Sequence, residues 1–248
     1  MSPHLNRRGF LKASAFTLGS SAALAATSPR VHAQAQAPGK ILGTVIDFAA
    51  GVPDAQAIKA AGHSGTVRYV SGRRPGTESW MLGKPVTLTE TKNNAALGLA
   101  TASVYQFGKE ATADWKSGAA GALIHAPQAI DFHHKAGGPL HRPIYVAIDD
   151  NPSREQYTTL IRPYLQQFNV LLAQSNYQLG IYGNYNTIDW AIRDGLGSFF
   201  WQHDWGSRGL IHPRVTIHQV AGYQRNVGGV IVDVNNVYAK DWGQWLPV

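Results

Sequence analysis

Short apolar runs alternate with amphipathic stretches along most of this chain. Five runs are continuous and rich in β-branched or apolar residues, and each is bounded by Gly, Asp or Asn, as is typical of strands buried on both faces. The predicted strands are Thr44–Phe48, Thr66–Val70, Ala102–Phe107, Ile144–Ile148 and Leu179–Tyr182. The predicted helices between and after them are Pro53–Ala61, Leu88–Leu97, Asp114–Ala136, Ser153–Ala173 and Thr187–Asp194. Five strand–helix units in series predict a parallel sheet.

Helix termini are marked by local signals. Ser153 with Gln156 three residues later forms a capping-box sequence. Gly137 and Gly195 follow predicted helices, where the backbone turns into a positive φ. These signals support the helix boundaries in the second half of the chain.

The pattern changes after Gly195, where three strands follow without an amphipathic helix. They are predicted at Ser198–Gln202, Val215–Val220 and Val230–Val234. The links 206–214 and 222–227 are short and contain Gly or Pro, so we predict hairpin-like links and an antiparallel seventh strand. The eighth strand would then run in the direction of the first six.

These elements predict an α/β fold, a single TIM-like (β/α)5β3 barrel over residues 40–248. An open doubly wound sheet is the alternative fold. That fold favours a Gly-rich phosphate turn after its first strand, and the stretch from Asp47 to Gly51 is not one.

The N-terminus has the parts of an export signal. Arg7 and Arg8 precede Gly-Phe-Leu-Lys, a short apolar stretch follows, and residues 31–33 read Val-His-Ala. This pattern resembles the twin-arginine motif. We therefore predict a signal peptide over residues 1–33, a short N-terminus over residues 34–39, and a secreted, periplasmic or cell-envelope location. The twin-arginine export machinery is the expected partner, and no stable membrane span is expected after cleavage, because the apolar stretch is too short.

Composition narrows the function. The 248 residues are 44% hydrophobic and 15% charged, and they include no cysteine, which excludes disulfides, thiolate metal sites and cysteine catalysis. The net charge of +7 owes much to the leader, because the first 33 residues hold four of the 22 basic residues and no acid. The remaining 18 basic and 15 acidic residues give no support for nucleic-acid binding.

Acidic residues gather at strand ends. Asp47, Asp149, Asp150 and Asp233 stand at or just beyond predicted strand ends, where the loops of a parallel barrel converge on one mouth. Strand alternation places Asp47, Asp149 and Asp233 on interior faces and turns Asp150 outward. We predict these four as the catalytic candidates and expect Asp149, surrounded by like charges, to hold a proton.

Aromatic and amide side chains accompany the carboxylates. Sugar rings pack on aromatic planes and their hydroxyls need fixed polar partners, so the pattern favours a carbohydrate ligand. The predicted substrate-binding residues are Tyr69, Tyr105, Tyr145, Tyr182, Trp201, Gln202, Gln219 and Asn235. We predict no cofactor and no metal, because His203, Asp204 and His218 lack a ligand spacing.

Several stretches carry a family resemblance. They are Thr44–Phe48, Tyr69–Gly76, Ile144–Asn151, Asn184–Ala191, Phe200–His203, His218–Val220 and Gly228–Asn235. Together they resemble the glycoside-hydrolase-like domain of exported actinobacterial twin-arginine substrates. That domain is similar to the Chalaropsis-type lysozymes, which are secreted muramidases with a (β/α)5β3 barrel. The resemblance implies a cell-wall or related polysaccharide as partner.

The resemblance also implies a site, with one departure. In those lysozymes the first strand ends in Asp, the fourth in Asp-x-Glu and the last in Asp-x-Asn. Asp47, Asp149 and Asp233 with Asn235 match, but Asn151 replaces the Glu and cannot transfer a proton. Three interpretations follow. The first is a glycoside hydrolase of the cell envelope, with an N-acetyl group of the substrate as nucleophile. The second is a glycan-binding or wall-remodelling factor without activity, and the third is a metal-dependent hydrolase that uses the Asp cluster.

Overall fold

The structure is a computed structural model that describes residues 38–248. The predicted signal peptide and most of the short N-terminus lie outside these described residues. Within them, no helix has the length and apolar character needed to cross a bilayer.

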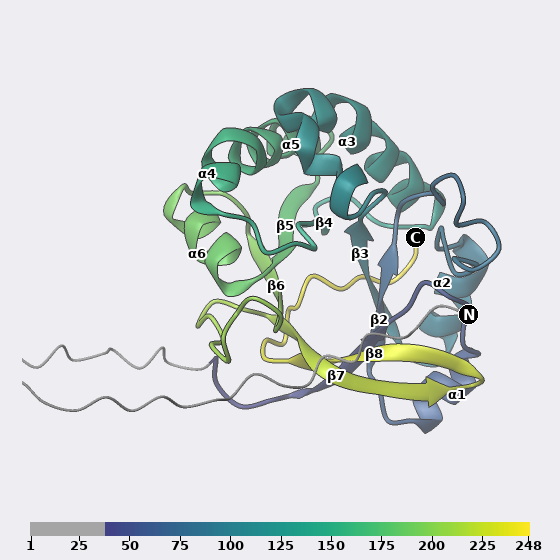
Figure 1. Ribbon diagram of the computed structural model, residues 1–248. Coiled ribbons are helices and arrows are strands. Elements are labelled where there is room, and N and C mark those ends of the chain that lie inside the picture. The colour runs from purple at the N-terminus through teal and green to yellow at the C-terminus, as the bar shows by residue number, and fades with distance from the viewer. Residues whose placement is uncertain (1–37) are drawn as a thin grey trace, which may run out of the picture. The chain divides into compact units, whose positions relative to one another are not determined.

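Eight strands close into one barrel in the order β1 to β8 (Figure 1). The strands are β1 (Gly43–Asp47), β2 (Gly65–Tyr69), β3 (Ala100–Tyr105), β4 (Pro143–Ala147), β5 (Gln178–Gly183), β6 (Phe199–His203), β7 (Ile217–Val227) and β8 (Val230–Val237). Neighbours from β1 to β7 pair in parallel, and β8 is antiparallel to both β7 and β1. The open doubly wound sheet is therefore excluded.

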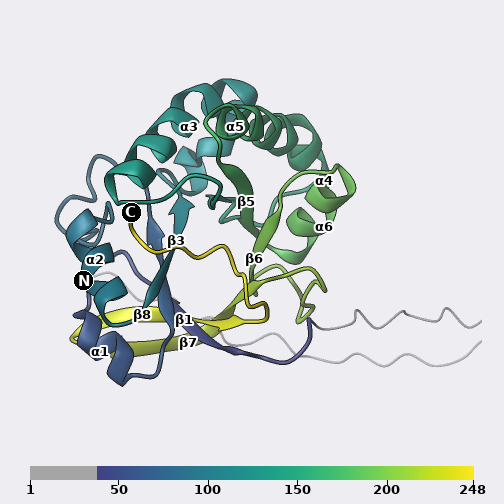
Figure 2. The same ribbon diagram turned by 180° about the vertical axis from the view of Figure 1, so that it is seen from behind.

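Helices follow each of the first five strands. They are α1 (Ala55–Ala60), α2 (Leu88–Ala96), α3 (Gly118–Lys135), α4 (Arg154–Gln156), α5 (Arg162–Gln174) and α6 (Tyr185–Arg193), with 3₁₀ turns at Glu110–Thr112 and Asp114–Ser117 and a π turn at Tyr157–Ile161. The views from front and back place α3 to α6 along one side of the barrel and the β7–β8 hairpin on the other (Figures 1 and 2). The Ser153 capping box forms, and Gly137 and Gly195 have φ of 81° and 70°, as predicted.

The direction of the seventh strand was predicted wrongly. β7 runs parallel to β6, because residues 204–216 between them are long enough for a crossover without a helix. The predicted 222–227 link is part of β7, and the tight turn to β8 is Gly228-Gly229, with φ of 56° and 86°. The antiparallel strand is thus β8. Asp233 still opens at the predicted mouth, since it lies near the start of a reversed strand.

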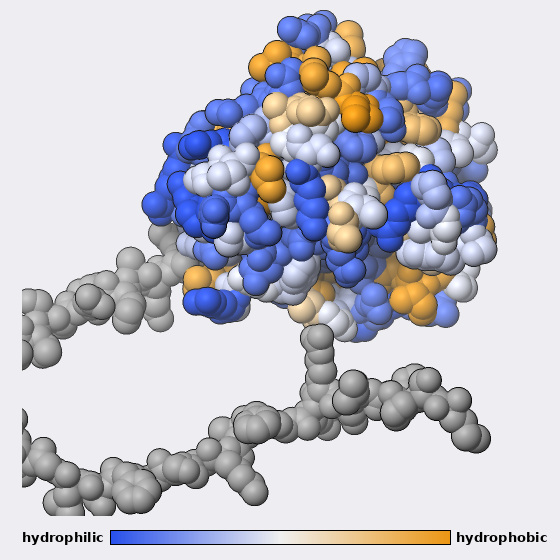
Figure 3. All heavy atoms as spheres, turned by 45° about the horizontal axis from the view of Figure 1, so that its top comes forward, coloured by the Kyte–Doolittle hydropathy of each residue, from blue (hydrophilic) through white to orange (hydrophobic). Residues whose placement is uncertain are grey.

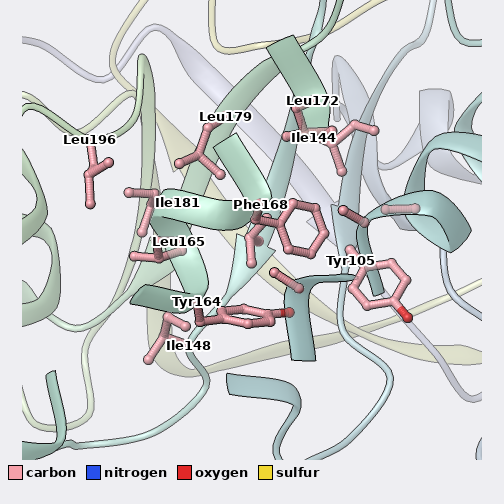
Figure 4. Packing of buried hydrophobic residues seen from close by; sticks show 14 of the residues in the cluster. Tyr105, Ile144, Ile148, Tyr164, Leu165, Phe168, Leu172, Leu179, Ile181 and Leu196 are labelled. Carbon is pink, nitrogen blue, oxygen red and sulfur yellow. The ribbon is translucent and has the colours of Figure 1, made fainter. Parts of the chain in front are cut away.

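Alternation along the strands divides the apolar side chains between two layers. Inward residues such as Val45, Val67 and Val104 fill the barrel, and outward residues pack under the helices. Figure 4 shows the outer layer, where Leu165, Phe168 and Leu172 of α5 meet strand residues. The face in Figure 3, with the helices brought forward, is mostly hydrophilic with separate apolar groups, so the main core lies beneath the helices.

Candidate active site

A cleft of about 410 Å³ opens at the end of the barrel where the parallel strands finish. Three of its lining residues are the carboxylates Asp47, Asp149 and Asp233. Alternation predicted these three as inward-facing, and the structure brings them together at one mouth. The cleft therefore unites side chains from β1, the end of β4 and β8.

Asp47 is the most buried of the three carboxylates, with 2% of its surface exposed. It lies directly opposite Asp233 in the antiparallel β1–β8 pair, so the two side chains are close neighbours on one face. Burial first, and then the charge of Asp233, raise the pKa of Asp47 to about 7. Asp47 can therefore exchange a proton near neutral pH.

Two amides hold one oxygen of Asp47. Gln219 Nε2 and Asn235 Nδ2 donate to Asp47 Oδ2 over 2.9 and 2.8 Å. Because amide N–H groups prefer an oxygen without a proton, this arrangement leaves the proton to Oδ1. The orientation of Asp47 is thus fixed by β7 and β8.

The two amides are oriented in turn by aromatic side chains. Trp201 Nε1 donates to Asn235 Oδ1 over 2.8 Å, and the Tyr182 hydroxyl donates to Gln219 Oε1 over 2.6 Å. The two rings pack with centroids 4.3 Å apart. Since Trp201 and Tyr182 are 2% and 6% exposed, they support the site more than they offer faces to a ligand.

Asp149 has a cationic partner. Lys109 Nζ lies 3.0 Å from Asp149 Oδ2, and Gln106 Nε2 donates to the same oxygen over 3.1 Å. Asp233 accepts a hydrogen bond from Gln224 Nε2 over 2.8 Å. The sequence led us to expect a proton on Asp149, and the carboxyl group with a raised pKa in the structure is Asp47.

Exposed aromatic rings lie at the edge of the cleft. Trp80 and Trp205 both line it and are 50% and 44% exposed. Trp205 is stacked on the buried ring of His203, with centroids 4.7 Å apart and planes at 20°. Tyr69, predicted from the sequence, also lines the cleft. Of these three rings, Trp80 and Trp205 present exposed surface at the cleft.

Five predicted site residues do not line the cleft: Asn235 lies behind it, where it holds Asp47, and the other four have different places. Tyr105 is on the outer face of β3 because its neighbour Val104 faces inward, and its hydroxyl contacts His125 Nδ1 at 2.7 Å. Figure 4 shows the Tyr105 ring near Phe168 in the helix layer. Gln202 is on the outer face of β6 because its neighbour Trp201 faces inward. Its side chain anchors the following loop by donating to Leu210 O and accepting from His212 N.

Tyr145 and Asp150 also do not line the cleft, each for a different reason. Tyr145 does face the barrel interior, but it is deep in it, where its hydroxyl donates to Trp242 O over 2.7 Å. Asp150 does not line the cleft, and burial and the neighbouring Asp149 raise its pKa, while Lys116 and Trp115 lower it from the helix side. This placement agrees with the outward orientation that alternation predicted for Asp150.

Asn151 and Asp204 serve as loop anchors. Asn184 Nδ2 donates to Asn151 Oδ1 over 2.8 Å, and Asn151 packs against Gly206. Asp204 pairs with His218 at 2.5 Å and accepts from Ala221 N over 2.8 Å. Within residues 38–248, no group of three or more His, Asp or Glu side chains is arranged to hold a metal ion, so the metal-dependent interpretation gains no support there.

The sequence prediction missed several residues of the cleft. Trp80 and Lys84 lie in the long connection from β2 to α2, and Gln106 and Lys109 follow β3. Their positions depend on loop conformation and not on strand periodicity. The available signal was the cluster of arginines after β2, of which Arg74 lines the cleft.

The chain matches the family model "Rv2525c-like, glycoside hydrolase-like domain" over residues 56–239. The chain belongs to this family. The membership confirms the resemblance seen in the sequence.

Individual relatives agree with the family assignment. A Mycobacterium tuberculosis protein named "Putative peptidoglycan hydrolase Rv2525c" is 48% identical, over 97% of this chain and 99% of its own. The crystal structure of that Tat-secreted protein in complex with L-tartrate matches with a TM-score of 0.79 and 51% identity, over 82% of this chain and 99% of that one. The catalytic domain of the endolysin ply40 from Listeria monocytogenes bacteriophage P40 shares the fold, with a TM-score of 0.54 and 12% identity over 82% and 96% of the two chains.

Proposed function

We propose that this protein is an exported cell-envelope protein that binds peptidoglycan or a related polysaccharide in the cleft and hydrolyses its glycosidic bonds. The observation that carries the proposal is Asp47, a buried carboxyl group with a pKa of about 7 at the base of an open cleft. The name of the M. tuberculosis relative supports the substrate class. The exposed faces of Trp80 and Trp205 support carbohydrate binding.

The fold and the leader fit this proposal. The order of elements, with five strand–helix units followed by three strands, supports a TIM-like (β/α)5β3 barrel as one domain over residues 40–248. Residues 1–33 would direct twin-arginine export, and the M. tuberculosis relative is itself a Tat-secreted protein. The wall polymer and the export machinery are then the expected partners.

In the proposed reaction Asp47 is the general acid. Its Oδ1 proton moves to the glycosidic oxygen as the bond from that oxygen to the sugar C1 breaks, and Asp47 becomes a carboxylate held by the amides of Gln219 and Asn235. The same two hydrogen bonds lower the pKa of Asp47 against the effect of burial. They keep the pKa of Asp47 near neutral pH.

An N-acetyl group next to C1 would supply the nucleophile. Its carbonyl oxygen attacks C1 while Asp149, which is paired with Lys109, accepts a hydrogen bond from the amide N–H and stabilises its developing positive charge. Water then opens the cyclic intermediate, and Asp47 takes one proton back from that water. This route needs no group at the position of Asn151.

The test is release of reducing ends from purified wall glycan. We expect Asp47→Asn to reduce turnover by about 10² to 10⁴, as loss of a general acid does, and to leave glycan binding within about twofold to threefold of wild type. Asp150→Asn is the matched control, because this neighbouring carboxyl lies outside the cleft. Full activity in the Asp47 variant would exclude the assigned acid.

A second candidate function is glycan binding without hydrolysis. The observation that favours it is Asn151, which replaces the Glu of the lysozyme motif and is engaged with Asn184. This candidate predicts that wild-type protein binds wall oligosaccharides and releases no reducing ends. Measurable wild-type turnover that Asp47→Asn abolishes would exclude it.

A further inference from the structure

The two sides of the cleft carry opposite charge. Asp47 and Asp233 come from the paired strands β1 and β8. Arg74, Lys84 and Lys109 come from the connections that follow β2 and β3. Three cations and three carboxylates thus line the cleft, and the cations are in excess whenever Asp47 is protonated.

Lys84 is buried, with 3% of its surface exposed, although it lines the cleft. Its ammonium donates to Gln106 O over 2.7 Å and lies 4.1 Å from the centroid of the Tyr69 ring. An ammonium has three N–H donors, and neither neighbour carries a formal negative charge. Burying a cation in this way costs free energy that an anion would offset.

The other cations near this wall differ from Lys84 in their partners. Arg68 is paired with Glu90 at 2.5 Å, and Arg73 donates to three backbone carbonyls of its own loop. Lys109 is paired with Asp149. Among residues 38–248, Lys84 and Arg74 are the cations of the cleft that form no salt bridge with a carboxylate.

Lys84 and Arg74 also act on each other. The pKa of Lys84 is lowered to about 8, first by burial and further by the charges of Arg74 and Arg68. The carboxylates of Asp114, whose effect is the largest of the charges, and of Asp149 oppose this shift. Two cations that repel each other beside the same cavity form a region of positive potential. A negatively charged group placed between them would relieve both the repulsion and the desolvation of Lys84.

We propose that Lys84 and Arg74 form a subsite for a carboxylate carried by the glycan, so that the preferred ligand of this cleft is an acidic and not a neutral polysaccharide. The proposal rests on the proposed function and deepens it. The carboxylate would accept hydrogen bonds from Lys84 Nζ and the Arg74 guanidinium beside the Tyr69 ring. The sugar that bears it would extend toward Asp47 and Trp80, which line the same cleft.

Titration calorimetry on the full chain tests the subsite with defined tetrasaccharides. The neutral probe is β-1,4-linked N-acetylglucosamine, and the acidic probe alternates N-acetylglucosamine with N-acetylmuramic acid bearing a free lactyl carboxylate. We expect the acidic probe to bind about tenfold more tightly, as one charge-assisted contact provides. Arg74→Gln and Lys84→Met should each bring the two affinities to within about twofold by weakening binding of the acidic probe alone.

Lys92→Gln is the charge-matched control, since Lys92 is exposed on α2 outside the cleft. Arg74→Gln keeps the test valid if the buried Lys84 variant does not fold. Wild-type protein that binds no acidic probe more tightly than the neutral probe, or a preference for an acidic probe that survives in Arg74→Gln, would overturn the subsite and leave the proposed function standing. Failure of both probes to bind would contradict the proposed function itself.

A third probe distinguishes two sources of the carboxylate. In tetragalacturonic acid the carboxylate is attached to the ring, whereas in the muramic-acid probe it is on an ether substituent. Tighter binding of either acidic probe than of the neutral one, lost in Arg74→Gln, supports the subsite, and the tighter of the two identifies the source. Binding of both acidic probes more weakly than the neutral probe would show that the carboxylates of the cleft dominate, and would overturn it.

Discussion

At the scale of single residues, opposing effects determine the pKa of Asp47. Its burial and the facing Asp233 favour the protonated form, while two amide donors favour the ionised form. Like charges placed directly opposite on a strand pair destabilise the pair. The site therefore contains a carboxyl group whose ionisation costs folding free energy.

This cost gives a pH dependence of stability. The pKa of Asp47 is about 7 in the folded protein and 3.8 as its ordinary value, so between these values the folded state binds more protons than the unfolded state. The contribution of Asp47 to the free energy of unfolding is fully present below about pH 4, decreases as the pH rises, and is lost above about pH 7. We expect Asp47→Asn to raise the free energy of unfolding, relative to wild type, by on the order of 4 kcal/mol at pH 8.

Urea denaturation of both proteins at about pH 4 and about pH 8 checks the prediction. The difference between Asp47→Asn and wild type should be much larger at the higher pH. Asp131→Asn is the control for removing an exposed carboxyl group outside the cleft. A difference that is the same at both pH values would show that Asp47 ionises normally in the folded protein.

Residue-level prediction from the sequence succeeded where alternation alone decides orientation. Asp47, Asp149 and Asp233 face the interior because their strands are regular up to the mouth. The prediction of Tyr145 failed because an inward residue can lie at any depth in the barrel. Tyr105 and Gln202 failed because residue type was given more weight than the inward orientation of their neighbours Val104 and Trp201.

At the scale of elements, the connection from β2 to α2 shapes one wall of the cleft. Arg68, fully buried, donates to Phe48 O and Gly83 O and pairs with Glu90 of α2. One side chain thus ties together a strand, a helix and the loop that carries Lys84. Periodicity contains no information on such a loop, so the sequence did not predict Trp80 or Lys84 as cleft residues.

Breaking this buried ion pair should destabilise the fold. We expect Glu90→Gln to lower the free energy of unfolding by about 3 kcal/mol, because Arg68 keeps its charge in a buried position. Asp131→Asn, which breaks the exposed pair with Lys135, should cost less than about 0.5 kcal/mol. Chemical denaturation checks both values, and equal small effects would contradict the structural role of Arg68.

The same loop presents Trp80 to the cleft. We expect Trp80→Ala to weaken binding of a wall oligosaccharide about fivefold, the equivalent of roughly 1 kcal/mol from a lost aromatic stacking surface. Leu82→Ala is the control, because Leu82 is an exposed apolar residue of the same loop outside the cleft. Calorimetric titration measures both, and unchanged affinity in Trp80→Ala would remove this ring from the binding surface.

At the scale of the whole molecule, the barrel was predicted from the series of strand–helix units, and closure follows from eight strands. The direction of the last strands was harder to predict, because the 204–216 crossover has no helix to mark it. Its conformation depends on tertiary contacts such as Gln202 with Leu210 O and Asp204 with His218. These contacts join residues that no local pattern relates.

Export provides a prediction for the entire chain. If residues 1–33 are a twin-arginine signal, replacing Arg7 and Arg8 by lysine should retain the protein in the cytoplasm and block cleavage of the leader. Cell fractionation with immunoblotting checks this result. Replacement of Lys12 by arginine is the control, because it preserves the charge without altering the arginine pair, and undiminished export of the double variant would contradict the assignment.

The pairing of β1 with β8 determines when the cleft can first exist. Asp47 belongs to the first strand of the barrel and Asp233 to the last. The ribosome makes β1 before every other strand and β8 after them, so until β8 is made Asp47 has neither its facing carboxylate nor the Asn235 amide. A nascent chain that lacks β8 therefore also lacks the environment that sets the acidity of Asp47, and the proposed general acid forms only when the barrel closes.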